Sequence, residues 1–503
     1  MTKKYKSIVA ILFIACMYWL SACVKEETAA YKNDEVPNIT IRWLIVGERS
    51  KSQEGIVAKF NEELQKFFPG TTVEFEIVNE ASYKEKWDMI MAANESIDIV
   101  WVGSDMFNYT EEVKKGSFMA LDYLLTTFGE DLIAEIPEEM WNMQMRDGKI
   151  YSVPLKGALY RADYAAVASK SNMEKYGDME RIRTVNQEHL YSDAQCYEVF
   201  EEYLENLQLE HKLGTGLSCD TFVKIADKGY EGIYGQASPF VIRIFDEELR
   251  VYNKYELESY KAYFRKMHEW YQAGYIREDI EEVLVPNNDN GIPSGNAVFL
   301  DEYGESGVVS DEIVTEYEAV RIPLQRYKYI SYEMGRNALA IPRTTENPQR
   351  AMEIINLLNS QRGAELCKLL ANGVEGRHFV QRENNQIDKV VDENGKALHS
   401  LSPDIIGNRF LNYENDVMEF KQLEKYNEEA IRSPLIGFEL DTRMIVLEMT
   451  QVDLIVAKYF GTLKCGTAEN WEEEYNDMIR EMKSAGADKV IVEIQKQLDV
   501  FTE

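Results

Sequence analysis

NITIRWLIVG (residues 38–47) alternates polar and apolar residues and then turns fully apolar, as expected of a buried strand. The chain continues with a helical pattern, a strand pattern, a second helical pattern and a third apolar strand at 53–68, 72–78, 83–93 and 97–102. A strand–helix–strand–helix–strand order is typical of a parallel sheet with helices on its faces. These residues therefore predict an α/β fold.

The rest of the chain adds further α/β elements and a helical C-terminal part. Strand patterns occur at 148–154, 165–169 and 335–342, and amphipathic helical patterns include 192–207, 257–273, 441–460 and 471–485. Residues 38–503 exceed what one hydrophobic core usually organises, so we expect two lobes. Ligands of open α/β sheets bind at the carboxyl ends of the strands, which places the loops that begin at Gly47 and Gly103 near a cleft.

The charge of the chain argues against some classes of partner. The sequence contains 87 Asp and Glu residues against 55 Lys and Arg residues, for a net charge of −32. Such a surface repels phosphate groups, so we expect no binding to nucleic acid. The composition is otherwise that of a globular protein, with 45% hydrophobic residues.

The sequence lacks the common motifs of catalytic and metal sites. It has no GxxxxGK[ST], HExxH or GxSxG pattern, and it contains only five histidines. Cys196, Cys219, Cys367 and Cys465 are widely scattered and form no CxxC pair, which leaves a Cys196–Cys219 disulfide open. We therefore expect a binding protein with no catalytic residue, no metal site and no cofactor.

The N-terminus has the pattern of a bacterial lipoprotein signal. Three lysines in the first six residues precede an apolar run at 8–20, which is too short to span a bilayer of about 30 Å. The run ends in LSAC (20–23), so we expect a signal peptide at 1–22 and a lipid on Cys23. The alternative is an ordinary signal peptide with a chance cysteine. Residues 23–37 are polar and aperiodic, which predicts a flexible tether to the outer face of the cell membrane.

Aromatic and polar residues gather where the fold predicts a cleft. A sugar presents apolar C–H faces and hydroxyl groups, so its site needs aromatic platforms beside carboxylate, amide and cationic partners. Candidates are Trp101, Asp105 and Tyr109 at the end of the third strand, Lys156 and Tyr164 in the next cluster, and Tyr303 in a glycine-rich loop. The alternative role for each aromatic residue is packing in the core.

Several stretches resemble the extracellular solute-binding proteins of carbohydrate ABC importers, and more closely the LipO or LplA lipoproteins. The stretches are NEASYKEKWDMIMAANESIDIVWV (79–102), GSFMALDYLL (116–125), GKIYSVP (148–154), WYQAGYIRED (270–279), NALAIPRTTENPQRA (337–351), GVEGRHF (373–379), SPLIGFELD (433–441) and AGADKVIVEIQKQL (485–498). The last two resemble a C-terminal domain of uncharacterised role that this subgroup carries.

The resemblance implies a two-lobed, type II periplasmic-binding-protein-like fold, in which each lobe is a mainly parallel sheet flanked by helices. It assigns 38–157 and 335–373 to the first lobe, and 158–334 and 374–503 to the second. It places Asp105 where relatives often contact sugar hydroxyls, Tyr164 where they often carry an aromatic residue, and Arg336 and Asn337 beside the cleft.

The resemblance also implies a mechanism and partners. We expect a monomer that captures an oligosaccharide by hinge closure, with uronate-containing oligosaccharides among the candidates, and delivers it to the permease subunits of an ABC importer. A separate ATPase would use ATP, and the lipid would be the only membrane anchor. Two alternatives remain open, namely a secreted carbohydrate-processing lipoprotein enzyme and a ligand-sensing adaptor.

Overall fold

The computed structural model describes residues 38–502, except for 104–108, 157–163, 215, 218, 236, 282–297, 303–317, 333–336, 383–386, 394, 403–404 and 409–424. The predicted signal peptide, Cys23 and tether lie outside the described residues, and so do Asp105, Tyr303 and Arg336. Within the described part of the chain, no helix combines the length and the apolar composition that a membrane span requires.

The first lobe contains the sheet that its sequence predicts. The strands are β1 (Ile39–Val46), β2 (Thr71–Val78), β3 (Ile99–Val102), β6 (Ser152–Pro154) and β14 (Ala338–Ala340), in the order β2-β1-β3-β14-β6. β1 pairs parallel with both β2 and β3, whereas β14 runs antiparallel to both β3 and β6. The parallel βαβαβ unit at 38–102 is therefore confirmed.

Helices and a hairpin complete the first lobe. They are α2 (Gln53–Leu64), α3 (Glu80–Ala93), α4 (Tyr109–Lys114), α5 (Asp122–Phe128), α6 (Glu130–Glu135), α7 (Glu138–Gln144), β4 (Met145–Arg146), β5 (Lys149–Ile150), α15 (Pro348–Leu358), η3 (Gln361–Gly363) and α16 (Ala364–Asn372). Local signals set their ends: the Asn79 side chain accepts a hydrogen bond from Ser82 N to cap α3, and Pro348 occupies the first turn of α15. The apolar faces of these helices and of the sheet form one core.

The second lobe is built differently from the first. Its sheets are β11-β7-β12, with β7 (Tyr164–Ser169), β11 (Val298–Glu302) and β12 (Ala319–Pro323), and β10-β9-β8, with β8 (Tyr230–Gly232), β9 (Phe240–Arg243) and β10 (Tyr252–Asn253). Every strand pair in these two sheets is antiparallel. The mainly parallel sheet expected in this lobe is therefore wrong, because β7 lies between two strands that return alongside it.

The helices of the second lobe include the helical C-terminal part that the sequence predicts. They are α8 (Lys170–Tyr176), α9 (Met179–Glu188), α10 (Gln195–Glu198), α11 (Glu201–Leu209), α12 (Cys219–Ala226), η1 (Lys254–Glu256), α13 (Glu258–Gln272), α18 (Val446–Cys465), α19 (Trp471–Ser484) and α20 (Ala487–Thr502). The last three helices share one core with α13, which contributes Phe264 and Trp270. Gly466 ends α18 at φ 73°, and a Cβ there would collide with the backbone of Met267.

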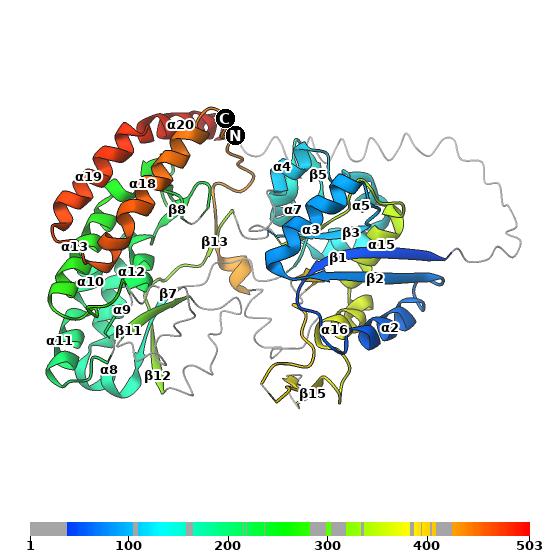
Figure 1. Cartoon of the computed structure of the whole chain (residues 1–503), viewed down its shortest axis with the longest axis horizontal. Helices are drawn as coiled ribbons and strands as arrows, with labels where there is room; N and C mark the ends of the chain where they lie inside the picture. Colours follow the sequence, from blue (N-terminus) through cyan, green and yellow to red (C-terminus); the bar gives the residue numbers. More distant parts are fainter. Residues whose placement is uncertain are drawn as a thin grey trace, which may run out of the picture.

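Two short strands cross between the lobes. β13 (Tyr329–Ile330) and β17 (Ile431–Arg432) pair in parallel, and Figure 1 shows β13 between the two lobes. The hairpin β15 (Phe379–Gln381) and β16 (Ile387–Lys389) follows α16, and Leu401, Ile406 and Ala430 belong to the core of the first lobe. Described residues as far along the chain as Ala430 thus contribute to the core of the first lobe, whereas the resemblance assigns 374–503 to the second lobe.

Candidate functional site

One edge of the first-lobe sheet brings three chain segments together. Ala338, the first residue of β14, lies opposite both Val102 at the end of β3 and Pro154 at the end of β6. The preceding residue, Asn337, has an exposed side chain, and its carbonyl accepts a hydrogen bond from Leu155 N at 2.9 Å. The predicted ligand-binding residues at the end of β3, after β6 and at Asn337 therefore belong to the same edge of the sheet.

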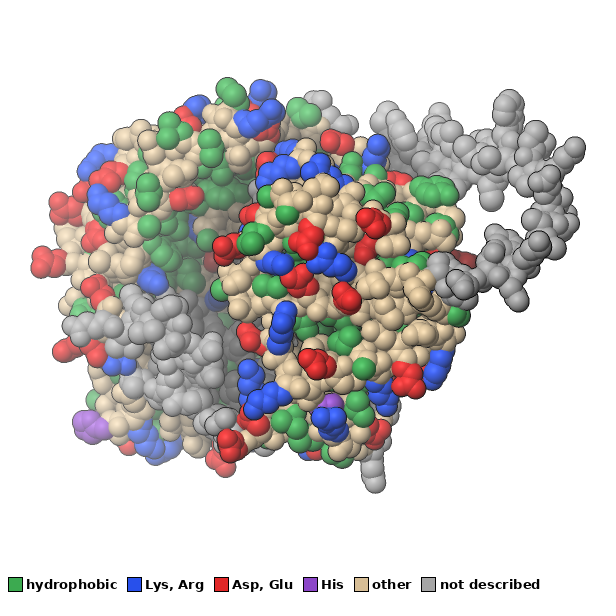
Figure 2. Space-filling view, turned by 45° about the vertical axis from the view of Figure 1, so that its right-hand side comes forward, with side chains coloured by type: hydrophobic (Ala, Val, Ile, Leu, Met, Phe, Trp, Pro, Cys, Tyr) green, Lys and Arg blue, Asp and Glu red, His purple; other side chains and the backbone are tan. Residues whose placement is uncertain are grey.

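The second lobe presents a matching edge. Tyr164 at the start of β7 pairs with Glu302 at the end of β11, and Ala165 pairs with Pro323 at the end of β12. Only nine residues, 155–163, join Pro154 to Tyr164, so the Cα atoms of these two residues lie at most about 36 Å apart. The space-filling view in Figure 2 shows the surface hollowed between the two lobes. This cleft is the candidate site.

The structure places Trp101 in the core of the first lobe. Its side chain is 6% exposed, and its ring meets Tyr83 edge-to-face at 5.8 Å between centroids. The Tyr83 hydroxyl donates to the Trp101 carbonyl at 2.9 Å, and a Cβ at Gly103 would collide with the Trp101 ring. Among the described residues, the indole N–H of Trp101 has no hydrogen-bond partner. Trp101 therefore lies beneath the start of the loop after β3 and supports it from below.

Tyr109 connects three elements beside the cleft. Its hydroxyl donates to the Gln144 carbonyl at 2.9 Å and accepts from Ser152 Oγ at 3.0 Å. The Arg146 guanidinium lies 4.8 Å from the centre of its ring. Burial raises the pKa of Tyr109 to about 12, so the phenol stays neutral at physiological pH. These contacts give Tyr109 a structural role, and its contact with a ligand stays a prediction.

The other two candidates have different surroundings. Lys156 Nζ lies 3.6 Å from Glu135 Oε2, so this lysine has a partner on the first lobe. The backbone of Tyr164 pairs with Glu302, which places Tyr164 directly beside the residue that precedes Tyr303. The contacts of these residues with a ligand stay predictions.

Contacts between the first lobe and the segment at 432–439 are not predicted by the sequence. Arg146 contacts the Glu439 carboxylate, and Thr110 Oγ1 donates to the same carboxylate at 3.3 Å. Arg432 Nη2 lies 3.0 Å from Glu139 Oε1. These ion pairs join residues about 300 positions apart, and no periodicity or motif in the sequence marks such pairs.

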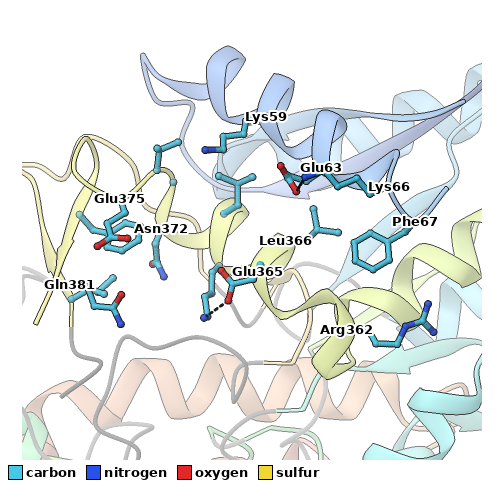
Figure 3. A pocket seen from close by; sticks show the side chains of 16 residues that line it. Lys59, Glu63, Lys66, Phe67, Arg362, Glu365, Leu366, Asn372, Glu375 and Gln381 are labelled. Carbon is cyan, nitrogen blue, oxygen red and sulfur yellow. Dashed lines mark hydrogen bonds and ion pairs between the residues drawn. The ribbon is translucent and has the colours of Figure 1, made fainter. Parts of the chain in front are cut away.

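A separate groove lies on the first lobe away from both sheet edges. Its volume is about 640 Å³, and it is lined by α2, α16 and the β15–β16 hairpin, as Figure 3 shows. Lys66 pairs with Glu63 at 2.5 Å and Lys368 with Glu365 at 2.6 Å, so much of its charge is neutralised internally. The groove is lined by first-lobe residues alone and is no part of the cleft.

Metal-ligating side chains and cysteines are the groups that could add chemistry to a binding site. Within the described residues, no group of three or more His, Cys, Asp or Glu side chains is arranged to hold a metal ion. Cys196 is buried and lies in no disulfide, so the Cys196–Cys219 bond that the sequence leaves open does not form.

Comparisons with known proteins agree with this geometry. Residues 434–503 match the family described as a domain of unknown function (DUF3502). A carbohydrate ABC transporter substrate-binding protein of Streptococcus pneumoniae serotype 4 (strain ATCC BAA-334 / TIGR4) is 23% identical over 468 residues, which cover 92% of this chain and 90% of the relative. The family resemblance seen in the sequence is thereby confirmed.

The structural neighbours settle the fold. The N-glycan transport solute-binding protein NgtS of Streptococcus pneumoniae matches with a TM-score of 0.74 and 20% identity over 92% of this chain and 98% of NgtS. This chain has the fold of a type II solute-binding protein. NgtS in complex with Man1GlcNAc matches with a TM-score of 0.66 (20% identity; 92% and 99% covered), and NgtS in complex with Man5GlcNAc with 0.62 (21% identity; 92% and 98% covered).

Proposed function

We propose that this chain is the solute-binding component of a carbohydrate ABC importer and captures an oligosaccharide between its lobes. The observation that carries the proposal is the hollow between two lobes that are joined by crossover segments, with sheet edges at Ala338 in one lobe and Tyr164 in the other (Figure 2). A ligand that contacts both edges is held fully only when the lobes close, so binding shifts the population toward the closed form. The permease subunits would then recognise that closed shape. The similarity to a carbohydrate-transport protein over about nine-tenths of both chains supports this assignment.

The TM-scores support an arrangement in which the lobes stand apart. The three NgtS structures have nearly the same identity to this chain, yet the structure whose name gives no ligand matches best. Sequence divergence is nearly the same in all three comparisons, so a different arrangement of the NgtS lobes would account for the difference in TM-score. If the lobes of NgtS close on a sugar, the TM-score between that closed form and a chain with separated lobes would be lower.

The ligand class follows from two considerations. NgtS is named for N-glycan transport and was solved with mannose-containing saccharides, which supports an oligosaccharide as the ligand of this chain. The net charge of −32 repels anionic sugars at long range, which favours a neutral oligosaccharide over one that contains uronate. A lipid on Cys23 would keep the chain at the outer face of the membrane, close to its permease.

Binding and turnover distinguish this function from a carbohydrate-processing enzyme. The protein is incubated with Man5GlcNAc, a uronate oligosaccharide and maltose, and thermal unfolding, small-angle scattering and product formation are followed. A ligand at 100 times its Kd stabilises the folded state by about 2.7 kcal/mol, and closure reduces the radius of gyration. We expect both effects with a neutral oligosaccharide and no product from any sugar. Turnover, or an unchanged scattering curve across a broad saccharide panel, would refute the proposal.

A further inference from the structure

A buried carboxylate lies where the two crossover strands meet the second lobe. Glu231, in the middle of β8, is 5% exposed. Its Oε1 accepts hydrogen bonds from Ser331 Oγ at 2.6 Å and Tyr332 N at 3.1 Å. Its Oε2 accepts from Tyr329 Oη at 2.5 Å and Ser433 Oγ at 2.5 Å. Four donors from two distant segments thus converge on one side chain.

The donors come from both crossovers, and the crossovers are also bound to each other. Ser433 N donates to the Ile330 carbonyl at 2.8 Å, and Ile431 N donates to the Lys328 carbonyl at 2.9 Å. Breaking a hydrogen bond between buried groups leaves both partners without water, so such bonds hold their segments firmly. β8, β13 and β17 are therefore fastened together as one unit on the second lobe.

β13 and β17 are attached to the first lobe by a different kind of contact. Ile330 and Ala430 pack into the core of the first lobe through apolar contacts, which have no preferred direction. The Lys328 ammonium lies 3.9 Å from the centre of the Tyr426 ring, and Arg432 pairs with Glu139 on a partly exposed surface. Exposed ion pairs are screened by water and contribute little, so we expect this side to yield more easily than the other.

We infer that Glu231 is the positioning residue of the hinge. It fixes the two crossover strands β13 and β17 to the second lobe, so that both move with that lobe, and the pivot of these two strands lies on the first-lobe side of Ser331 and Ser433. The inference deepens the proposed function, because it assigns the residue that sets the angle between the lobes. The geometry predicts that removing this carboxylate loosens the angle even when no sugar is present.

The test measures the distance between the lobes in the ligand-free protein. Genetically encoded spin labels replace the exposed residues Met89 on α3 and Leu209 on α11, and pulsed electron resonance gives the distribution of label distances. We expect Glu231→Leu to widen this distribution at least twofold. The matched control is Glu112→Leu, which removes a buried, hydrogen-bonded glutamate inside the first lobe and should leave the width unchanged.

Two more variants keep the test decisive. Glu231→Gln retains an acceptor for Ser331 and Tyr332, and the hydroxyls of Tyr329 and Ser433 can turn to accept from its amide, so we expect nearly the original width. If Glu231→Leu fails to fold, the double variant Ser331→Ala and Ser433→Ala removes two donors and should still widen the distribution. An unchanged width in a folded Glu231→Leu protein or in the double variant would overturn the inference. No sugar is present, so a wrong ligand assignment does not affect this result.

Discussion

Among the described residues, each lobe buries one hydrogen-bonded glutamate, and the two differ in what they connect. Glu112 on α4 is 4% exposed and accepts from Trp87 Nε1 at 3.1 Å, Ser117 Oγ at 2.7 Å and Lys115 Nζ at 2.9 Å, with sequence separations of 25, 5 and 3. The donors to Glu231 are separated from it by 98, 100, 101 and 202 residues. The first glutamate braces one lobe, whereas the second joins the segments that connect the lobes.

Their electrostatic surroundings also differ. Burial disfavours the charged form of Glu112, but hydrogen bonds from Ser117, Lys115 and Trp87 outweigh burial and hold its pKa below the ordinary value. Burial raises the pKa of Glu231, and its hydrogen bonds compensate only in part. Among the described residues, no Lys or Arg lies within ion-pair distance of Glu231. A carboxylate without a cation is expensive to bury, so its retention at the hinge fits a positioning role.

The largest expected effect is the loss of stability when the hinge carboxylate is removed. Glu231→Leu leaves four buried donors without their acceptor, and we expect the free energy of unfolding to fall by about 3 kcal/mol. Glu112→Leu deprives two buried donors of their acceptor, whereas the exposed Lys115 ammonium regains water, so we expect a loss of about 2 kcal/mol. Urea unfolding followed by tryptophan fluorescence measures both losses. A larger loss for Glu112→Leu would contradict the comparison.

The second prediction uses pH, because the two pKa shifts have opposite signs. The pKa of Glu231 is raised above 4.5, so its stabilisation is full below pH 4.5 and is lost as the pH rises through the folded-state pKa. The pKa of Glu112 is lowered, so its stabilisation is full above pH 4.5 and is lost as the pH falls through the folded-state pKa.

Neutral glutamine variants isolate each group. The difference in unfolding free energy between the original protein and Glu231→Gln should shrink as the pH rises, whereas the difference for Glu112→Gln should shrink as the pH falls. Other titrating groups cancel in each difference, since they are present in both proteins. If both differences in unfolding free energy changed with pH in the same direction, the two glutamates would have similar surroundings, which would contradict the structure.

The same contrast between local and distant contacts explains what the sequence could predict. The unit at 38–102 was predicted correctly because each strand and helix has its own periodicity and pairs with near neighbours. β7 was predicted as a strand, but its direction relative to β11 and β12 depends on partners more than 120 residues away. The predicted helix at 192–207 is divided into α10 and α11, with Val199 and Phe200 between them in the core.

The site shows the same limit at the level of single residues. Trp101 lies at the end of β3 as predicted, but its ring is buried in the core. The sequence could not predict this orientation, because the position of a residue along a strand does not reveal which way its side chain points. The Tyr109 hydroxyl has two hydrogen-bond partners, as is usual for a buried tyrosine, and these partners come from α7 and β6. Glu231 was missed altogether, since one acidic residue among 87 Asp and Glu carries no local signal.

The smallest expected effect concerns the exposed ion pair on the first-lobe side of the hinge. Arg432 and Glu139 have side chains that are 38% and 31% exposed, so water and salt screen their attraction. We expect Glu139→Gln to change the free energy of unfolding by less than about 0.5 kcal/mol and to leave the width of the interlobe distance distribution unchanged. The ion pair closes no cavity and satisfies no buried group, whereas Glu231 satisfies four donors. If Glu139→Gln widened the distribution as much as Glu231→Leu, the exposed pair would hold the lobes as firmly as the buried cluster. The crossovers would then be fixed to the first lobe as well, and the pivot would have to lie within β13 and β17 themselves.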